Sequence, residues 1–148
     1  MERTQTCRPE AMTAGTPGPA DRLTLTELVL PSLTNHYGTL FGPHGLALLG
    51  KAAYLVATRC TRQAIVMVGA NRIEFLRPAP VGALLRLEAG ISRVGRTSLT
   101  ARVTACFDAG PGTCAQTVLS GDFEMVAVDQ HGRPTPVVTP ALAAPADT

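Results

Sequence analysis

The sequence predicts a single α+β domain in which one long helix lies against an antiparallel sheet of about five strands. Its 148 residues suit one domain with a sizeable core. Residues 44–62 are apolar on nearly all sides, which is typical of a buried helix. The segments before and after this helix alternate between apolar and polar residues, as strands with one buried face do.

The composition narrows the possible functions. Hydrophobic residues make up 45% of the chain and charged residues 16%, so the chain is not disordered overall. The net charge is only +2 and the arginines are scattered, which does not indicate a nucleic-acid partner. No apolar run is long enough to cross a membrane, and the first residues lack the apolar core of a secretory signal. We therefore expect a cytoplasmic protein.

The cysteines have no spacing that indicates a metal site or a redox motif. The four positions are Cys7, Cys60, Cys106 and Cys114, and no two form a C-x-x-C pair. Reduced thiols are the expected state in a cytosolic protein, and no metal is predicted.

Two end segments differ from the rest in composition. Residues 1–20 are rich in Thr, Pro, Gly and Ala without periodicity, and predict a flexible N-terminal arm. Residues 138–148 are similar and predict a flexible tail. The folded domain is therefore expected at 21–137.

The first half of this domain predicts a strand, a loop and the helix. The strand covers Leu23–Leu30 and is stopped by a proline, and the loop covers 32–41. Pro43 suits the first position of a helix, because its missing N–H is no loss there. Gly50 in mid-helix costs about 1 kcal/mol relative to Ala, so a constraint other than helix propensity is expected there.

The second half predicts four strands joined by short turns. They cover 64–76, 81–94, the alternating run 99–107, and 115–128. Gly95 and Arg96 form the turn of a hairpin, and a second loop covers 109–113. One such protomer leaves a sheet edge and apolar helix surface uncovered, so at least a two-fold homodimer is expected.

The loop before the helix carries a family resemblance. Residues 34–42 read TNHYGTLFG, which resembles the T-N-x-x-G-x-x-F-G-G loop of the acyl-CoA thioesterase (acyl-CoA hydrolase) branch of the hotdog superfamily. Four further matches follow in the same order: IEFLRP at 73–78 with VG at 81–82, VGRTS at 94–98, F at 123 with VAVD at 126–129, and GRP at 132–134. The resemblance implies a hotdog fold, in which a curved sheet wraps the central helix.

The resemblance also implies a function and its residues. Hydrolysis of an acyl-CoA thioester needs a carboxylate that activates water or attacks the carbonyl, and backbone N–H groups for the oxyanion. Asn35 matches the family's active-site Asn, which positions water or the thioester. The helix start from Gly42 to Gly45 matches the oxyanion-binding end, where His44 and Gly45 offer N–H groups. The pantetheine-binding surface matches Arg77 and the turn formed by Gly95, Arg96, Thr97 and Ser98.

Other groups of the substrate have weaker candidates. Arg59, Arg62, Arg93 and Arg96 are possible contacts for the phosphates of coenzyme A, or solvated surface charges. Coenzyme A enters only as part of the substrate, so no separate cofactor is expected. Relatives in this family often form trimers of dimers.

Two departures from the family pattern affect the expected reaction. Gly50 stands where the family carries its helix carboxylate, and no Asp or Glu occurs between Glu27 and Glu74. Pro43 replaces the second Gly of the family pair and has no N–H to donate. Gly50 also vacates side-chain volume that could deepen an acyl pocket.

Two functions remain open from the sequence. In the first, the chain is a thioesterase with altered chemistry, in which His44 or His36 acts as the base. Alternatively, it is a non-catalytic hotdog protein that binds acyl thioesters or assembles with an active homologue. A hotdog dehydratase or hydratase is not supported, because the loop before the helix has no Asp to pair with its His.

Overall fold

The computed structural model describes residues 21–110 and 113–139. The elements follow the chain as β1 (Arg22–Leu28), a 3-10 turn η2 (Pro31–Leu33), α1 (Gly42–Thr61), β2 (Ala64–Phe75), β3 (Leu84–Val94), β4 (Ser98–Gly110) and β5 (Thr113–Val128). The predicted N-terminal arm, 1–20, lies outside the described residues, as does all of the predicted tail beyond residue 139.

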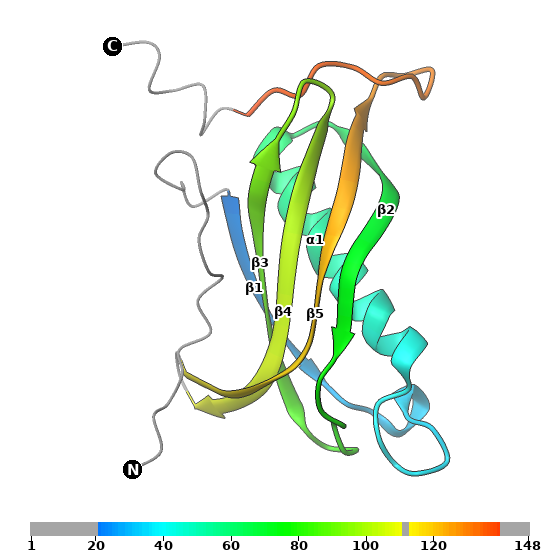
Figure 1. Ribbon diagram of the computed structural model, residues 1–148, viewed down its shortest axis with the longest axis vertical. Coiled ribbons are helices and arrows are strands. Elements are labelled where there is room, and N and C mark those ends of the chain that lie inside the picture. The colour runs from blue at the N-terminus through cyan, green and yellow to red at the C-terminus, as the bar shows by residue number, and fades with distance from the viewer. Residues whose placement is uncertain (1–20, 111–112, 140–148) are drawn as a thin grey trace.

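The five strands form one antiparallel sheet in the order β1-β3-β4-β5-β2. The sheet curves around α1, which lies along its inner face (Figure 1). The predicted α+β class and the hotdog arrangement of one helix and five strands are therefore confirmed. β1 and β2 are the two edges of this sheet.

The core lies between α1 and the inner face of the three central strands. Every second residue of these strands points inward, and most of these residues are at most 1% exposed: Leu85, Leu87, Ala89, Leu99, Ala101, Val103, Ala105, Phe123, Met125 and Ala127. The facing side of α1 is built largely from Leu49, Ala52, Ala53, Val56 and Ala57. The small alanines let the helix backbone lie close to the sheet. No helix in the described part of the chain has the length and apolar character needed to cross a membrane.

The boundaries differ from the sequence prediction at two places. The helix begins at Gly42, so Pro43 is its second residue and not its first. Proline is still tolerated, because the first four N–H groups of a helix have no acceptor within it. The predicted loop 109–113 is shorter than expected, because β4 continues to Gly110 and β5 starts at Thr113. Gly110 has φ +130°, a conformation that favours glycine.

The expectation of reduced thiols is wrong for two of the four cysteines. Cys106 in β4 and Cys114 in β5 are joined by a disulfide, and their Cα atoms lie 5.7 Å apart. The spacing of the two residues in the sequence did not indicate this pair, because it depends on the register of neighbouring strands. Cys60 is a buried free thiol, and Cys7 lies outside the described residues.

Gly121 on β5 is a place where neighbouring side chains leave no room for a methyl group. A Cβ there would come closer than 3.0 Å to Cδ1 of Ile73 and to 3.3 Å from Cε2 of Phe123. By contrast, a Cβ at Gly69 of β2 would meet only ordinary contacts, the nearest being 3.8 Å from Cβ of Glu124. A side chain at 121 would therefore require the end of Ile73 to shift.

We predict that Gly121→Ala lowers the free energy of unfolding by about 1–3 kcal/mol, because Ile73 and Phe123 must shift to admit the methyl group. Urea unfolding measures this change. The matched control, Gly69→Ala, should change stability by no more than about 0.5 kcal/mol. Equal stabilities for Gly121→Ala and the parent protein would contradict the packing described.

Candidate acyl-thioester site

Asn35 organises the loop that precedes α1. Its Oδ1 accepts hydrogen bonds from the N–H of Tyr37 at 2.9 Å and from the N–H and Oγ1 of Thr39, both at 3.2 Å. An Asn side chain that bonds backbone N–H groups in this way stabilises a turn. The other side-chain atom, Nδ2, makes no hydrogen bond within the described residues. The Asn35 amide therefore holds the loop with one end and leaves a donor at the other.

This loop is fixed to the segment between β2 and β3. The N–H of Leu40 donates to the carbonyl of Ala79 at 2.7 Å, and the N–H of Val81 donates to the carbonyl of Gly38 at 2.9 Å. The N–H of Phe41 donates to the carbonyl of Leu33 at 2.8 Å. Asn35 thus stands on a loop with several backbone anchors.

The helix start offers different N–H groups from those that the sequence predicted. The N–H of Gly45 donates to the carbonyl of Phe41 at 3.0 Å, so it is part of the helix and is not available for an oxyanion. Pro43 has no N–H. The N–H groups of Gly42 and His44 make no hydrogen bond within the described residues. They are the remaining candidates, and Gly45 is corrected to a packing position, where its Cα faces Leu119 and Leu40.

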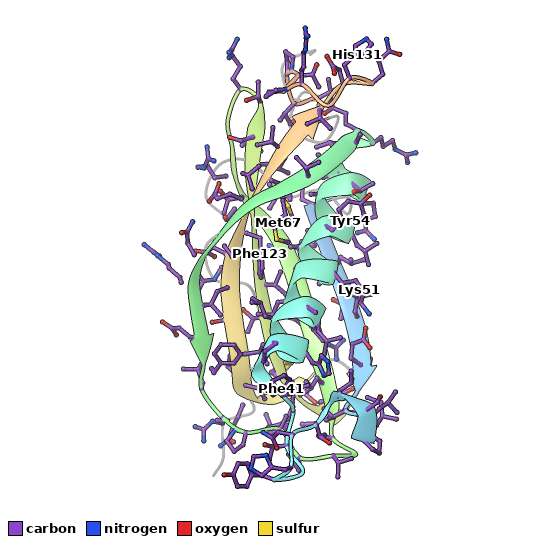
Figure 2. All side chains as sticks on the ribbon, turned by 90° about the vertical axis from the view of Figure 1, so that its right-hand side faces the viewer. Phe41, Lys51, Tyr54, Met67, Phe123 and His131 are labelled. Atoms are coloured by element: carbon purple, nitrogen blue, oxygen red, sulfur yellow. A yellow bond between two sulfur atoms is a disulfide. The ribbon has the colours of Figure 1, made fainter. Side chains whose placement is uncertain are left out.

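Gly50 faces side chains of the sheet and not open space. A Cβ at this position would lie 3.2 Å from Cε of Met67 and 4.0 Å from Cε1 of Phe123. Figure 2 shows Met67 and Phe123 on the same side of α1, toward β2. A side chain at position 50 would therefore require the flexible end of Met67 to shift. The end of Met67 borders the volume left by Gly50, and the deepened acyl pocket remains a prediction.

His44 points to a different side of the helix from Gly50. Six residues separate them, which corresponds to about 120° around the axis. Lys51 is seven residues after His44, so these two share a face, and Lys51 pairs with Glu27 of β1. Nδ1 of His44 is buried without a hydrogen bond within the described residues, beside the Phe41 ring. His36, the other candidate base, is exposed and stacks on Tyr37 in the loop.

The carboxylates of the strands point away from Gly50. Phe123 faces the core, so Asp122 and Glu124 lie on the outer face of β5. They pair there with Arg102 at 3.5 Å and Arg93 at 3.0 Å. The remaining described carboxylates also lie elsewhere, in pairs or turns or on the outer face: Asp21, Glu27, Glu74, Glu88, Asp108 and Asp129. No described carboxylate of this protomer therefore occupies the place that Gly50 leaves without one.

Two groups with shifted acidity lie outside the site. Burial raises the pKa of the Cys60 thiol to about 12, and its hydrogen bond to the Asp21 carboxylate and the charge of that group act in the same direction. Cys60 is therefore a neutral thiol and not a nucleophile. Burial also raises the pKa of Glu88, against the opposing charges of Arg86 and Arg22.

The residues predicted to hold pantetheine are divided between two ends of the molecule. Arg77 follows β2, and its N–H donates to the carbonyl of Val118 at the end that also carries the Asn35 loop (Figure 1). The turn from Gly95 to Ser98 lies at the opposite end, near the C-terminus of α1 (Figure 1). The 20 residues of α1 span about 30 Å. One protomer therefore does not bring the two groups together.

The 95–98 turn is itself well ordered by backbone hydrogen bonds. The N–H of Gly95 donates to the carbonyl of Ser98 at 2.7 Å, and the carbonyls of Thr97 and Arg96 accept from Ala127 and Val137. Among the phosphate candidates, Arg93 pairs with Glu124, and Arg59 donates to the carbonyl of Arg22. Arg62 is exposed and caps the helix in a left-handed conformation.

Met67 is the residue near the site that the sequence did not single out. Its inward position on an apolar strand predicts only a core residue, yet it is 45% exposed at the sheet edge. Its position next to the site is shown only by the distance of 3.2 Å between its Cε and a Cβ placed at position 50.

Comparison with known proteins places this architecture in a family. Residues 37–115 match the thioesterase superfamily. An uncharacterized acyl-CoA thioester hydrolase of Zymomonas mobilis is 34% identical over 119 residues, which is 80% of each chain. The chain therefore belongs to the thioesterase superfamily, within its acyl-CoA thioester hydrolases.

Solved structures agree with this assignment. The crystal structure of an apo-hexameric acyl-CoA thioesterase is 32% identical, with a TM-score of 0.76 over 88% of this chain and 90% of that chain. An acyl-CoA hydrolase from Staphylococcus aureus, in complex with butyryl coenzyme A and coenzyme A, shares the fold at 24% identity. Its TM-score is 0.72 over 81% of this chain and 71% of that chain.

We predict that Asn35→Ala lowers the free energy of unfolding by about 1 kcal/mol, because the loop loses the acceptor Oδ1. Asn35→Asp keeps this oxygen and should change stability by no more than about 0.5 kcal/mol. Chemical denaturation of the two variants measures the difference. Equal losses in both variants would show that Oδ1 does not stabilise the loop.

Proposed function

We propose that this protein binds acyl-CoA thioesters and hydrolyses them slowly, because Gly50 leaves the helix without the carboxylate that the reaction uses. The observation that carries this proposal is that position 50 has no side chain and that a Cβ there would lie 3.2 Å from Cε of Met67. The Met67 methyl group borders the place where a base or nucleophile would stand, and a single group of that kind contributes about 10²–10⁴-fold to the rate.

The remaining parts of the proposed site favour binding. The N–H groups of Gly42 and His44 lie at the positive end of the α1 dipole and suit a thioester carbonyl oxygen. The Nδ2 group of Asn35 is available to a ligand. An Asp or Glu is not needed to hold a thioester in this way, so affinity can persist when turnover is low.

The S. aureus hydrolase supports the assignment of position 50. Structures of that protein were also solved for three variants, in which an asparagine, an aspartate or a threonine is replaced by alanine. The aspartate is 15 positions after the asparagine, and the threonine is 17 positions after the aspartate. The same two intervals counted from Asn35 arrive at Gly50 and Met67. Under our proposal both polar side chains are replaced here, and only the asparagine is kept.

We further propose a homodimer that completes the site. The edge strand β2 and the adjoining face of α1 expose apolar side chains, among them Val66, Met67, Val68, Leu46 and Tyr54. Pairing two β2 edges antiparallel would bring the 95–98 turn of one protomer toward the Asn35 loop of its partner. Assembly into a trimer of dimers is proposed because the related thioesterase is hexameric. A cytoplasmic location is proposed because acyl-CoA is the ligand.

We expect the purified protein to bind butyryl-CoA while releasing thiol slowly. Isothermal titration measures binding, and a thiol-reactive dye measures hydrolysis across acyl-CoAs of short to long chain. Absence of binding for every chain length would contradict the proposed function. Binding with no thiol release at all would identify the non-catalytic alternative, and thiol release at 10 s⁻¹ or more, about the median for enzymes, would contradict slow turnover.

We predict that Gly50→Asp raises the rate of thiol release at least about 100-fold, because it restores a carboxylate to the helix. The Met67 end must move aside, which its flexible side chain allows. Gly50→Asn is the matched control, since it has the same size without the charge and should not raise the rate.

The double variant Gly50→Asp/Met67→Thr provides the second form of this test. Its rate of thiol release should equal or exceed that of Gly50→Asp, because a smaller polar side chain replaces the methyl group that crowds position 50. If both Asp variants remain folded and as slow as the Asn control, then the carboxylate position proposed here is wrong.

A further inference from the structure

The end of the β4–β5 hairpin carries a pair of cysteines that the proposed site does not use. Cys106 and Cys114 are joined by a disulfide with a Cα separation of 5.7 Å. Both residues are at most 1% exposed. A thiol pair held this close by two neighbouring strands can form and break its bond with little movement of the backbone.

The strand pairing around this disulfide is irregular. From Ser98 to Ala105 the β4–β5 ladder keeps one register, but three register shifts follow between Ala105 and Gly110. Irregular pairing at the end of a hairpin opens more readily than a regular ladder in a core. Local opening would therefore expose the buried sulfur atoms to small oxidants and reductants.

The start of β5 supports the proposed binding end of the molecule. The carbonyl of Val118 accepts hydrogen bonds from the N–H of Leu76 at 2.7 Å and of Arg77 at 3.2 Å. Leu119, the next residue, packs against Gly45 at the start of α1. The disulfide thus fastens a strand end that holds both the end of β2 and the first turn of the helix.

The same connection continues to the Asn35 loop. The segment after β2 provides the carbonyl of Ala79, which accepts from the N–H of Leu40 at 2.7 Å. Increased motion of the hairpin end would therefore be transmitted to the Asn35 loop through the hydrogen bond made by Leu76 and the one between Leu40 and Ala79. The Asn35 loop is part of a ligand-binding end only in the proposed function, so the link between the disulfide and ligand binding rests on that proposal.

We infer that Cys106 and Cys114 form a reversible redox site that tightens the binding end when oxidised and loosens it when reduced. In the proposed cytoplasmic location, thiols are kept reduced and disulfides are transient or redox-sensing. Oxidation by a peroxide converts the two thiols and one H₂O₂ into the disulfide and two water molecules, through a sulfenic acid on one cysteine. Reduction transfers two electrons and two protons from a dithiol, which itself becomes a disulfide.

The experiment compares the full chain after hydrogen peroxide and after dithiothreitol, with each reagent removed. Alkylation of the denatured protein, counted by mass, should modify all four cysteines in the reduced form and only two after peroxide. The Tm should be higher by about 5 °C in the oxidised form, because the disulfide restricts the unfolded chain. Butyryl-CoA, which has no free thiol, should bind several-fold more weakly to the reduced form.

Two variants serve as controls. The double variant Cys106→Ser/Cys114→Ser should have one Tm under both treatments, whereas Cys60→Ala should retain the response because Cys60 is not part of the pair. Four modified cysteines after peroxide, or equal Tm values for the two forms of the parent protein, would overturn the redox site. A Tm difference with equal butyryl-CoA affinity would overturn its link to the binding end. A Tm difference without any butyryl-CoA binding would instead count against the proposed function alone.

Discussion

The close approach of α1 to the sheet shapes the fold and, under the proposed function, the chemistry of this protein. Gly45 lies against Leu119 and Leu40, and Gly50 lies against Met67 and Phe123. Each glycine within a helix costs about 1 kcal/mol of helix propensity, which the burial of neighbouring apolar groups offsets. Because the helix backbone touches the sheet here, a sheet side chain fills the space beside position 50. Under the proposed function, the same arrangement leaves position 50 without a catalytic carboxylate.

In one protomer, the residues of the proposed site lie at two opposite ends of the sheet. The Asn35 loop, the free N–H groups of Gly42 and His44, and Arg77 all belong to one end of the sheet. The 95–98 turn belongs to the other end, about one helix length away. An antiparallel pair of protomers joined at β2 brings unlike ends together, which gives a physical reason for the dimer beyond the coverage of its apolar edge. Met67 lies on that edge strand, so the side chain nearest to position 50 is next to the proposed interface.

Much of the fold could be predicted from the sequence, because one face of each of the strands β3, β4 and β5 is buried. Alternation along β3, β4 and β5 identified their inward residues, and the apolar circumference of α1 identified the helix. Features that depend on the exact pairing of distant residues could not be predicted. The disulfide between Cys106 and Cys114 follows from the β4–β5 register, and the extension of β4 to Gly110 depends on a conformation that favours glycine.

The site was less predictable than the fold, again for physical reasons. A shift of one residue in the helix start means that the N–H of Gly45 is used within the helix, so an expected oxyanion donor is lost. The role of Met67 follows from its contact with Gly50, and apolar periodicity carries no sign of that contact. The expected function of Asn35 remains a proposal, while the structure adds a second role in the loop through Oδ1.

A crystal structure of the protein with bound butyryl-CoA tests the central claim most directly. We expect a thioester carbonyl oxygen about 3 Å from the N–H groups of Gly42 and His44. We also expect the Met67 methyl group against Gly50, with no carboxylate of either protomer in hydrogen-bond reach of the carbonyl or of a water beside it. An Asp or Glu side chain within about 3.2 Å of that water would contradict the claim that this site lacks its catalytic carboxylate.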